Sequence, residues 1–248
     1  MIFGKIKNWK DLQEKVCTLL NQVGFVAETE KKIATPRGEI EIDVFAYDPK
    51  SIDKITYIIE CKNWNNKIPQ TIVHSFTSVM NETGGNIGYI ISKEGFQKGS
   101  YDFINSTNIN IFTFENLQER YLNIWLSNFF SIKLRNSVDS FLQYTEPINS
   151  RRFRFIDNLE SESKKKFNEL YDKYELLGTT LSLLSYSKYQ NDFTLLRKLK
   201  IDFEKEFNII LKSDNYSDLL VELNQIIDNI TNQFNQVFGK NIFENKSA

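Results

Sequence analysis

Two carboxylates and an amine lie at the ends of two neighbouring apolar segments of this sequence. Asp43 comes near the end of Gly38–Ala46, and Glu60 and Lys62 end Tyr57–Lys62. A buried strand normally excludes charge, because an unpaired buried charge is costly. A divalent cation bound by both carboxylates is the most economical reason for charges at these positions.

The chemistry of such a cation follows from its ligands. Mg²⁺ prefers oxygen ligands and keeps several waters, and Asp43, Glu60 and the backbone carbonyl of Cys61 supply oxygens. The bound cation polarises a phosphodiester and lowers the pKa of a bound water. Lys62, on the same strand face as Glu60, orients that water and stabilises charge on the phosphorane. The pattern predicts phosphodiester hydrolysis that depends on Mg²⁺ or Mn²⁺.

An acidic-x-Lys tripeptide is a weak signal by itself. Only Glu60-Cys61-Lys62 closes an apolar strand and follows a second acid that closes the preceding strand. The alternative is a structural Glu60–Lys62 or Asp43–Lys62 ion pair at the end of a sheet. The same tripeptide pattern also occurs, without that context, at Glu30-Lys31-Lys32, Asp48-Pro49-Lys50, Glu162-Ser163-Lys164 and Glu244-Asn245-Lys246.

The elements that must position these groups can be read from hydrophobic periodicity. The sequence predicts strands at residues 25–34, 39–46, 55–62, 87–92 and 109–114, and helices at 9–20, 70–81 and 96–105. Three strands followed by alternating helices and strands predict an α/β domain with a mixed β-sheet flanked by helices.

Charged and β-branched residues alternate in the second predicted strand. Strict alternation places Glu39, Glu41 and Asp43 on one face, and Ile40, Ile42 and Val44 on the other. Glu41 is therefore a candidate accessory to the metal, although a solvated strand edge is the plainer interpretation.

From about Glu115 onward the sequence becomes helical. Helices are predicted at 117–130, 155–184, 193–211 and 219–238, and the last carries apolar residues at i, i+3, i+4 and i+7 spacing. Such a stripe is most often core and sometimes a dimer face. We expect a nuclease-like domain at 1–130 and an all-α C-terminal domain at 131–248.

The order of motifs in the first domain resembles that of the PD-(D/E)xK nucleases, and within them the Mrr-like restriction endonucleases. The pattern is a helix with Glu14, a Gly-x-x-x-x-Asp strand, a Glu-x-Lys strand, a helix and another strand. The similarity covers about residues 8–118. It includes Lys62-Asn63-Trp64, Ile68-Pro69, Val73-x-x-Phe76, Gly88-Tyr89-Ile90-Ile91-Ser92 and Gly95-Phe96-Gln97-Lys98-Gly99.

The resemblance implies a restriction-endonuclease-like core with Asp43, Glu60 and Lys62 as the catalytic residues. It implies that Glu14 is the helix carboxylate that approaches the metal, and that the context is antiviral defence against foreign DNA. Ile42 replaces the Pro of the superfamily's name, and Glu60 stands where Mrr-like proteins often carry Gln. The resemblance stops at the helical region.

Several residues near the predicted site are weaker candidates. Gln70 is a candidate accessory residue, with a surface role at a helix start as the alternative. His74 is more often structural than catalytic in such a helix. Loop residues that could contact DNA, with solvated charges and a packed Trp as the alternatives, are Trp64, Lys67, Lys93 and Lys98.

Composition limits the classes of partner. The net charge is −1, so DNA affinity requires a local basic face, for which Arg151–Arg154 and Lys164–Lys166 are candidates. Cys17 and Cys61 are too few for a disulfide framework or a structural zinc site. No apolar stretch approaches the length of a membrane span, so we expect a cytoplasmic protein.

We therefore expect a metal-dependent DNA endonuclease. Because cutting both strands with one site per chain calls for two protomers, a homodimer or larger assembly is expected. The helical region would dimerise, bind DNA, or receive a signal from a partner protein. The alternatives are a structure-selective nuclease or junction resolvase, and a non-catalytic nucleic-acid-binding or assembly module on a nuclease fold.

Overall fold

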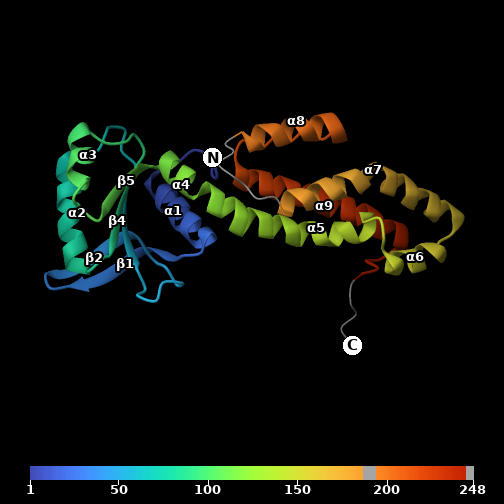
Figure 1. The fold of residues 1–248 in the computed structure, drawn as a ribbon, viewed down its shortest axis with the longest axis horizontal. Coiled ribbons are helices and arrows are strands. Elements are labelled where there is room, and N and C mark those ends of the chain that lie inside the picture. Colours follow the sequence, from blue (N-terminus) through green and yellow to red (C-terminus); the bar gives the residue numbers. More distant parts are fainter. Residues whose placement is uncertain (187–193, 244–248) are drawn as a thin grey trace. The chain divides into compact units, whose positions relative to one another are not determined.

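The computed structural model describes residues 1–186 and 194–243 of the 248-residue chain (Figure 1). The chain divides into two compact units between Asn128 and Phe129. In the described ranges, no helix combines the length and the apolar character needed to cross a membrane.

The N-terminal unit contains a five-stranded mixed sheet in the order β1-β2-β3-β4-β5. The first three strands pair antiparallel and the last three pair parallel. The strands are β1 (Val26–Thr35), β2 (Gly38–Tyr47), β3 (Thr56–Lys62), β4 (Ile87–Ser92) and β5 (Ile109–Thr113); the helices are α1 (Trp9–Val23), α2 (Gln70–Thr83), α3 (Lys98–Ile104) and α4 (Phe114–Trp125). The prediction of a mixed sheet flanked by helices is confirmed.

Helices cover both faces of this sheet (Figure 1), with α1 and α4 on one face and α2 and α3 on the other. On the α2 face, Val73, Phe76 and Met80 pack against buried isoleucines of the strands. Gly88 lets β4 approach α2, since a Cβ there would lie 2.8 Å from the Phe76 ring. This close packing gives β2 and β3 a rigid support on the α2 side.

The strict alternation expected in β2 breaks at Asp43. Ile42 and Phe45 belong to the same buried cluster although they are three residues apart, which regular alternation does not allow. Glu30 of β1 lies opposite Asp43, between the pairs Thr29–Val44 and Lys31–Ile42, and has a φ of 55°. The irregular backbone at Glu30 shifts the phase of the β2 side chains after Asp43. Ile40 and Ile42 still lie on the α2 face, and Glu41 and Asp43 line one cleft, as the alternation predicts.

All regular secondary structure in the described residues of the C-terminal unit is helical, as expected. Its long helices α5, α7 and α9 pack on one another around aromatic residues, and the rings of Tyr144 and Phe234 stack with centroids 5.1 Å apart. The helices are α5 (Ser131–Thr145), α6 (Ser150–Asp157), α7 (Ser161–Tyr186), α8 (Leu195–Phe207) and α9 (Tyr216–Phe238), with a short π-helix at Leu126–Phe130 before α5.

Two helix boundaries differ from the sequence prediction. The helix expected at 117–130 is α4 followed by the π-helix, and α5 was not predicted although Leu134, Val138 and Phe141 are spaced for it. The helix expected at 155–184 is divided by the break between α6 and α7. The expected start at Phe193 lies outside the described residues.

Candidate active site

Asp43 lies where β2 and β3 separate. The pairing of these strands ends at Val44–Ile59, so the next residues no longer share backbone hydrogen bonds. In their place, Asp43 Oδ2 accepts a hydrogen bond of 2.7 Å from the backbone N–H of Cys61. Asp43 Oδ1 accepts a second bond of 2.8 Å from Gln13 Nε2. A carboxylate thus occupies the gap between two buried strands and is fixed from both sides.

The surroundings of Asp43 raise the pKa of its carboxyl group. Partial burial raises the pKa of Asp43 and the charge of Glu60 raises it further, against the hydrogen bonds from Cys61 and Gln13 and the charge of Lys62. Lys62 Nζ contacts Glu60 Oε1 directly in an ion pair, and both side chains are about one-quarter exposed. Two carboxylates in this environment repel, and a cation would relieve that repulsion.

A cleft of about 580 Å³ opens beside Asp43. It is lined by residues of α1, β1, β2 and the end of β3, together with the segment that precedes α1 and the loop that follows β3. The lining residues are Lys7, Asn8, Trp9, Gln13, Glu30, Glu41, Asp43, Cys61, Lys62, Asn63 and Trp64. A charged, half-open cleft at the end of central strands suits a reaction on a polar substrate.

The oxygens in this cleft fit a hard cation. Gln13 Oε1 and Asn63 Oδ1 are buried and have no hydrogen-bond partner within the described part of the chain. Burial holds the pKa of the Cys61 thiol well above its ordinary value, so only its backbone carbonyl is a suitable ligand. Among residues 1–186 and 194–243, no three His, Cys, Asp or Glu side chains converge. A cation held by Asp43 and Glu60 would complete its shell with neutral oxygens and waters, as Mg²⁺ does.

The structure corrects the assignment of Glu14. Glu14 is exposed and does not line the cleft, whereas Gln13 is 5% exposed and binds Asp43. One residue along a helix rotates a side chain by about 100°, which moves Glu14 away from the sheet. The spacing of Gln13 from Val16 and Leu20, three and seven residues on, is the signal that could have identified it.

The other candidates divide between the cleft and its surroundings. Glu41 and Trp64 line the cleft, while Gln70 does not: its Nε2 lies 3.4 Å from His74 Nε2 on α2. Lys93 Nζ donates to Asn65 Oδ1 at 2.7 Å. Two exposed lysines, Lys67 and Lys98, also lie outside the lining. Residues of the cleft that sequence reasoning did not single out are Lys7, Asn8, Trp9, Gln13, Glu30 and Asn63.

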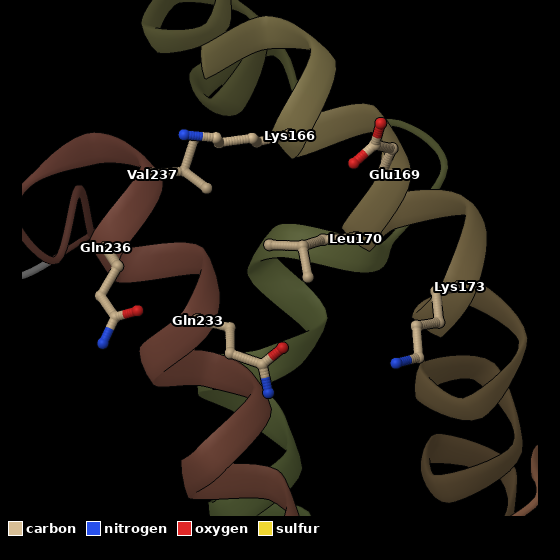
Figure 2. Close-up of a pocket in the computed structure, with 7 residues that line it drawn as sticks. All are labelled: Lys166, Glu169, Leu170, Lys173, Gln233, Gln236 and Val237. Atoms are coloured by element: carbon tan, nitrogen blue, oxygen red, sulfur yellow. The ribbon is translucent and has the colours of Figure 1, made fainter. Parts of the chain in front are cut away.

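A second hollow, in the C-terminal unit, lies between α7 and α9 (Figure 2). Its volume is about 500 Å³, and Glu169 is its only acidic lining residue. Figure 2 shows lysines at two levels of α7 and the amides of Gln233 and Gln236 on α9. Without a pair of carboxylates it offers no metal-dependent chemistry of the kind available at Asp43.

Comparison with known proteins bears on the N-terminal unit. Residues 6–121 match the family model Mrr_cat, described as a restriction endonuclease. Over these residues the N-terminal unit is similar to restriction endonuclease domains, and its mixed sheet is consistent with a restriction-endonuclease-like fold. Domains of this kind generally use divalent metal ions, in agreement with the oxygen ligands around Asp43.

Two solved structures are similar to the chain at low identity. One is the protein of unknown function AF1548, with 15% identity, a TM-score of 0.41, and coverage of 90% of this chain and 100% of that chain. The other is the DNA modification-dependent restriction endonuclease AspBHI, with 10% identity, a TM-score of 0.28, and coverage of 42% of this chain and 28% of that chain. No curated protein sequence matches the chain significantly.

Proposed function

We propose that the protein is a DNA endonuclease that hydrolyses phosphodiester bonds with Mg²⁺ or Mn²⁺ at Asp43, Glu60 and Lys62. The observation that carries the proposal is the half-buried Asp43, fixed between two separating strands next to a second carboxylate and an amine. A carboxylate whose pKa is perturbed by burial and by a neighbouring charge, at a cleft, is typical of a functional site.

Asp43, Glu60 and the backbone carbonyl of Cys61 are the groups that would hold the cation. When bound, the cation supplies polarisation of the scissile phosphodiester and acidification of a bound water. Gln13 and the N–H of Cys61 orient the Asp43 carboxylate through their hydrogen bonds. If Glu60 held a cation instead of Lys62, the Lys62 ammonium would be available to orient a water and to stabilise charge that develops on the phosphorane.

Defence against foreign DNA is the context that we propose from the restriction endonuclease family. Double-strand cutting by one site per chain requires a homodimer or a larger assembly. The helical region at residues 131–248 is proposed to mediate this assembly, to bind DNA, or to receive an activating signal.

The test is relaxation of a supercoiled plasmid by the full chain with Mg²⁺, with Mn²⁺ and with EDTA. We expect cleavage only with a cation, and a loss of about 100- to 1,000-fold in Lys62→Ala, as for removal of one group that stabilises transition-state charge. Lys50→Ala is the matched control, because Lys50 is exposed in the loop at the opposite end of β3.

Failure to cleave any supercoiled, linear, branched or single-stranded DNA with either cation would overturn the enzyme proposal. The direct Glu60–Lys62 contact would then be a structural ion pair, and the domain a binding module. Equal cleavage by wild type and Lys62→Ala would remove Lys62 from the mechanism.

A further inference from the structure

Two exposed tryptophans line the cleft that contains Asp43 and Lys62. Trp9 is 56% exposed and Trp64 is 44% exposed, whereas Trp125, the third in the chain, is fully buried. Exposed indoles leave a large apolar surface in water, and such surface at a cleft commonly marks a binding site. The two indoles beside the candidate catalytic groups therefore point to a ligand with an apolar, aromatic part.

Trp9 is held in place by the start of α1. It is the first residue of the helix, and the N-cap Asn8 accepts a hydrogen bond of 2.9 Å from the N–H of Asp11. Asp11 in turn accepts from the N–H of Lys7 at 2.7 Å and pairs with Lys15 at 2.9 Å. The backbone that carries the indole is thus fixed before any ligand arrives, which lowers the entropic cost of binding.

Trp64 is held by the loop that follows β3. The neighbouring Asn65 accepts a hydrogen bond of 2.7 Å from Lys93, and the Lys62 ammonium lies 5.9 Å from the centroid of the Trp64 ring. Between Lys62 and Trp64, Asn63 keeps a buried amide oxygen without a partner among the described residues. The Lys93–Asn65 bond fixes the loop that carries the Trp64 indole before a ligand binds, which lowers the entropic cost of binding.

The charge of the cleft argues against binding through phosphates alone. Lys7 and Lys62 are outnumbered by three acidic lining residues, Glu30, Glu41 and Asp43. Without a basic surface, affinity for the phosphate backbone is small. Stacking on the bases must therefore supply much of the total affinity for DNA. In an intact duplex the faces of the bases are covered by their neighbours, and an indole reaches them only where a nucleotide is unpaired.

We infer that Trp9 and Trp64 stack on an unpaired nucleotide next to the scissile phosphate, so that the preferred substrate is DNA with a single-stranded segment. The inference deepens the proposed nuclease function and rests on it for the scissile phosphate. The stacking contact itself needs neither the cation nor cleavage, and this allows the two to be tested separately.

The test is a titration of the full chain in EDTA, followed by tryptophan fluorescence, with a short single-stranded DNA and with a blunt duplex hairpin. Because Trp125 is fully buried, quenching reports on Trp9 and Trp64. We expect the single strand to quench and to bind tighter than the duplex. Trp9→Ala and Trp64→Ala should each weaken single-strand binding by about 5- to 150-fold, as measured for base–aromatic stacking.

Trp64→Phe keeps an aromatic ring and should retain most of the affinity, read through the quenching of Trp9. Tyr101→Ala is the control, since Tyr101 is an exposed aromatic of α3 outside the cleft lining, and it should bind like wild type. Equal affinity for duplex and single strand would overturn the inference. So would unchanged single-strand binding in a Trp9→Ala or Trp64→Ala variant that has the wild-type melting temperature.

The outcome also separates this inference from the nuclease proposal. If no cation supports cleavage but the Trp-dependent preference for single strands remains, the nuclease proposal fails and the binding site stands. If the tryptophan variants cleave every DNA at the wild-type rate, the stacking inference fails and the nuclease proposal stands.

Discussion

Each unit of the chain contains a partly buried carboxylate, and the two differ in what surrounds it. Asp43 has a second carboxylate nearby, and burial together with the charge of Glu60 raises its pKa. Burial also raises the pKa of Glu222 in α9. Hydrogen bonds from Ser213 and from the N–H of Lys212 outweigh that effect, so the pKa of Glu222 is lowered. The pKa of the carboxyl group is therefore raised in the N-terminal unit and lowered in the C-terminal unit.

The difference separates a structural carboxylate from one suited to chemistry. Glu222 Oε2 accepts from both the N–H and the hydroxyl of Ser213, at 3.0 and 2.5 Å, and ties the segment before α9 to the helix. Asp43 is also hydrogen-bonded, yet burial and the charge of Glu60 outweigh those bonds and the charge of Lys62, and raise its pKa. A residual cost of this kind is characteristic of functional sites, where a substrate or cation supplies the missing interaction.

The largest effect on stability is expected from Arg152 of the C-terminal unit. Arg152 is 2% exposed, and its Nη1 donates to the carbonyls of Tyr144 and Glu146 at 2.8 and 2.7 Å. Arg152→Ala would leave both carbonyls without this donor and create a cavity, at a cost of about 2–4 kcal/mol in the free energy of unfolding. Urea unfolding of the full chain measures this, with the exposed Arg154→Ala as control. A change as small as that of the control would show that Arg152 is not structural.

A smaller effect should distinguish Gln13 from Glu14 in the N-terminal unit. Gln13→Ala removes the hydrogen bond to Asp43 Oδ1 and should cost about 1–2 kcal/mol. Glu14→Ala changes an exposed side chain and should stay within about 0.5 kcal/mol of wild type. Thermal or urea unfolding of both variants gives the comparison, and the reverse order would restore Glu14 as the residue of α1 that supports the site.

The smallest effect, and the one that addresses the comparison of carboxylates, is the pH dependence of stability without metal. The pKa of Asp43 is raised in the folded state, so the contribution of Asp43 to stability falls as the pH rises through that pKa. The pKa of Glu222 is lowered in the folded state, so the contribution of Glu222 to stability is lost as the pH falls through that pKa. Raising the pH from below the ordinary carboxyl range to neutrality should therefore favour Asp43→Asn relative to wild type, mostly above that range, and disfavour Glu222→Gln, mostly below it. Melting temperatures across this range measure it, and slopes of the same sign would contradict the contrast.

Much of the N-terminal unit could be predicted from the sequence because its signals are local. Runs such as Ile87–Ser92 define strands by composition, and the position of Asp43 and Glu60 near the ends of successive strands places them together. The phase shift at Asp43 could not be predicted, since it depends on a positive φ at Glu30, a residue type that gives no such indication.

Other features depend on tertiary contacts that no single pattern encodes. The choice between Gln13 and Glu14 depends on the rotation of α1 about its axis, which is set by packing against the sheet. The two exposed tryptophans come from segments more than fifty residues apart, and only the folded chain brings them to one cleft. Helix α5 is different, since the apolar spacing of Leu134, Val138 and Phe141 is a local signal sufficient to predict it.

The central claim is that the Asp43 cluster holds a divalent cation and cleaves DNA. The direct measurement compares wild type, Asp43→Asn and Glu222→Gln, a carboxylate-to-amide change in each unit, for plasmid cleavage and for the rise in melting temperature with Mn²⁺. Wild type and Glu222→Gln should cleave, and at ten times the dissociation constant Mn²⁺ should raise their melting temperatures by about 3–6 °C. Asp43→Asn should lose both the shift and, by at least about 100-fold, the cleavage. Cleavage and a Mn²⁺ shift in Asp43→Asn equal to those of wild type would contradict the account.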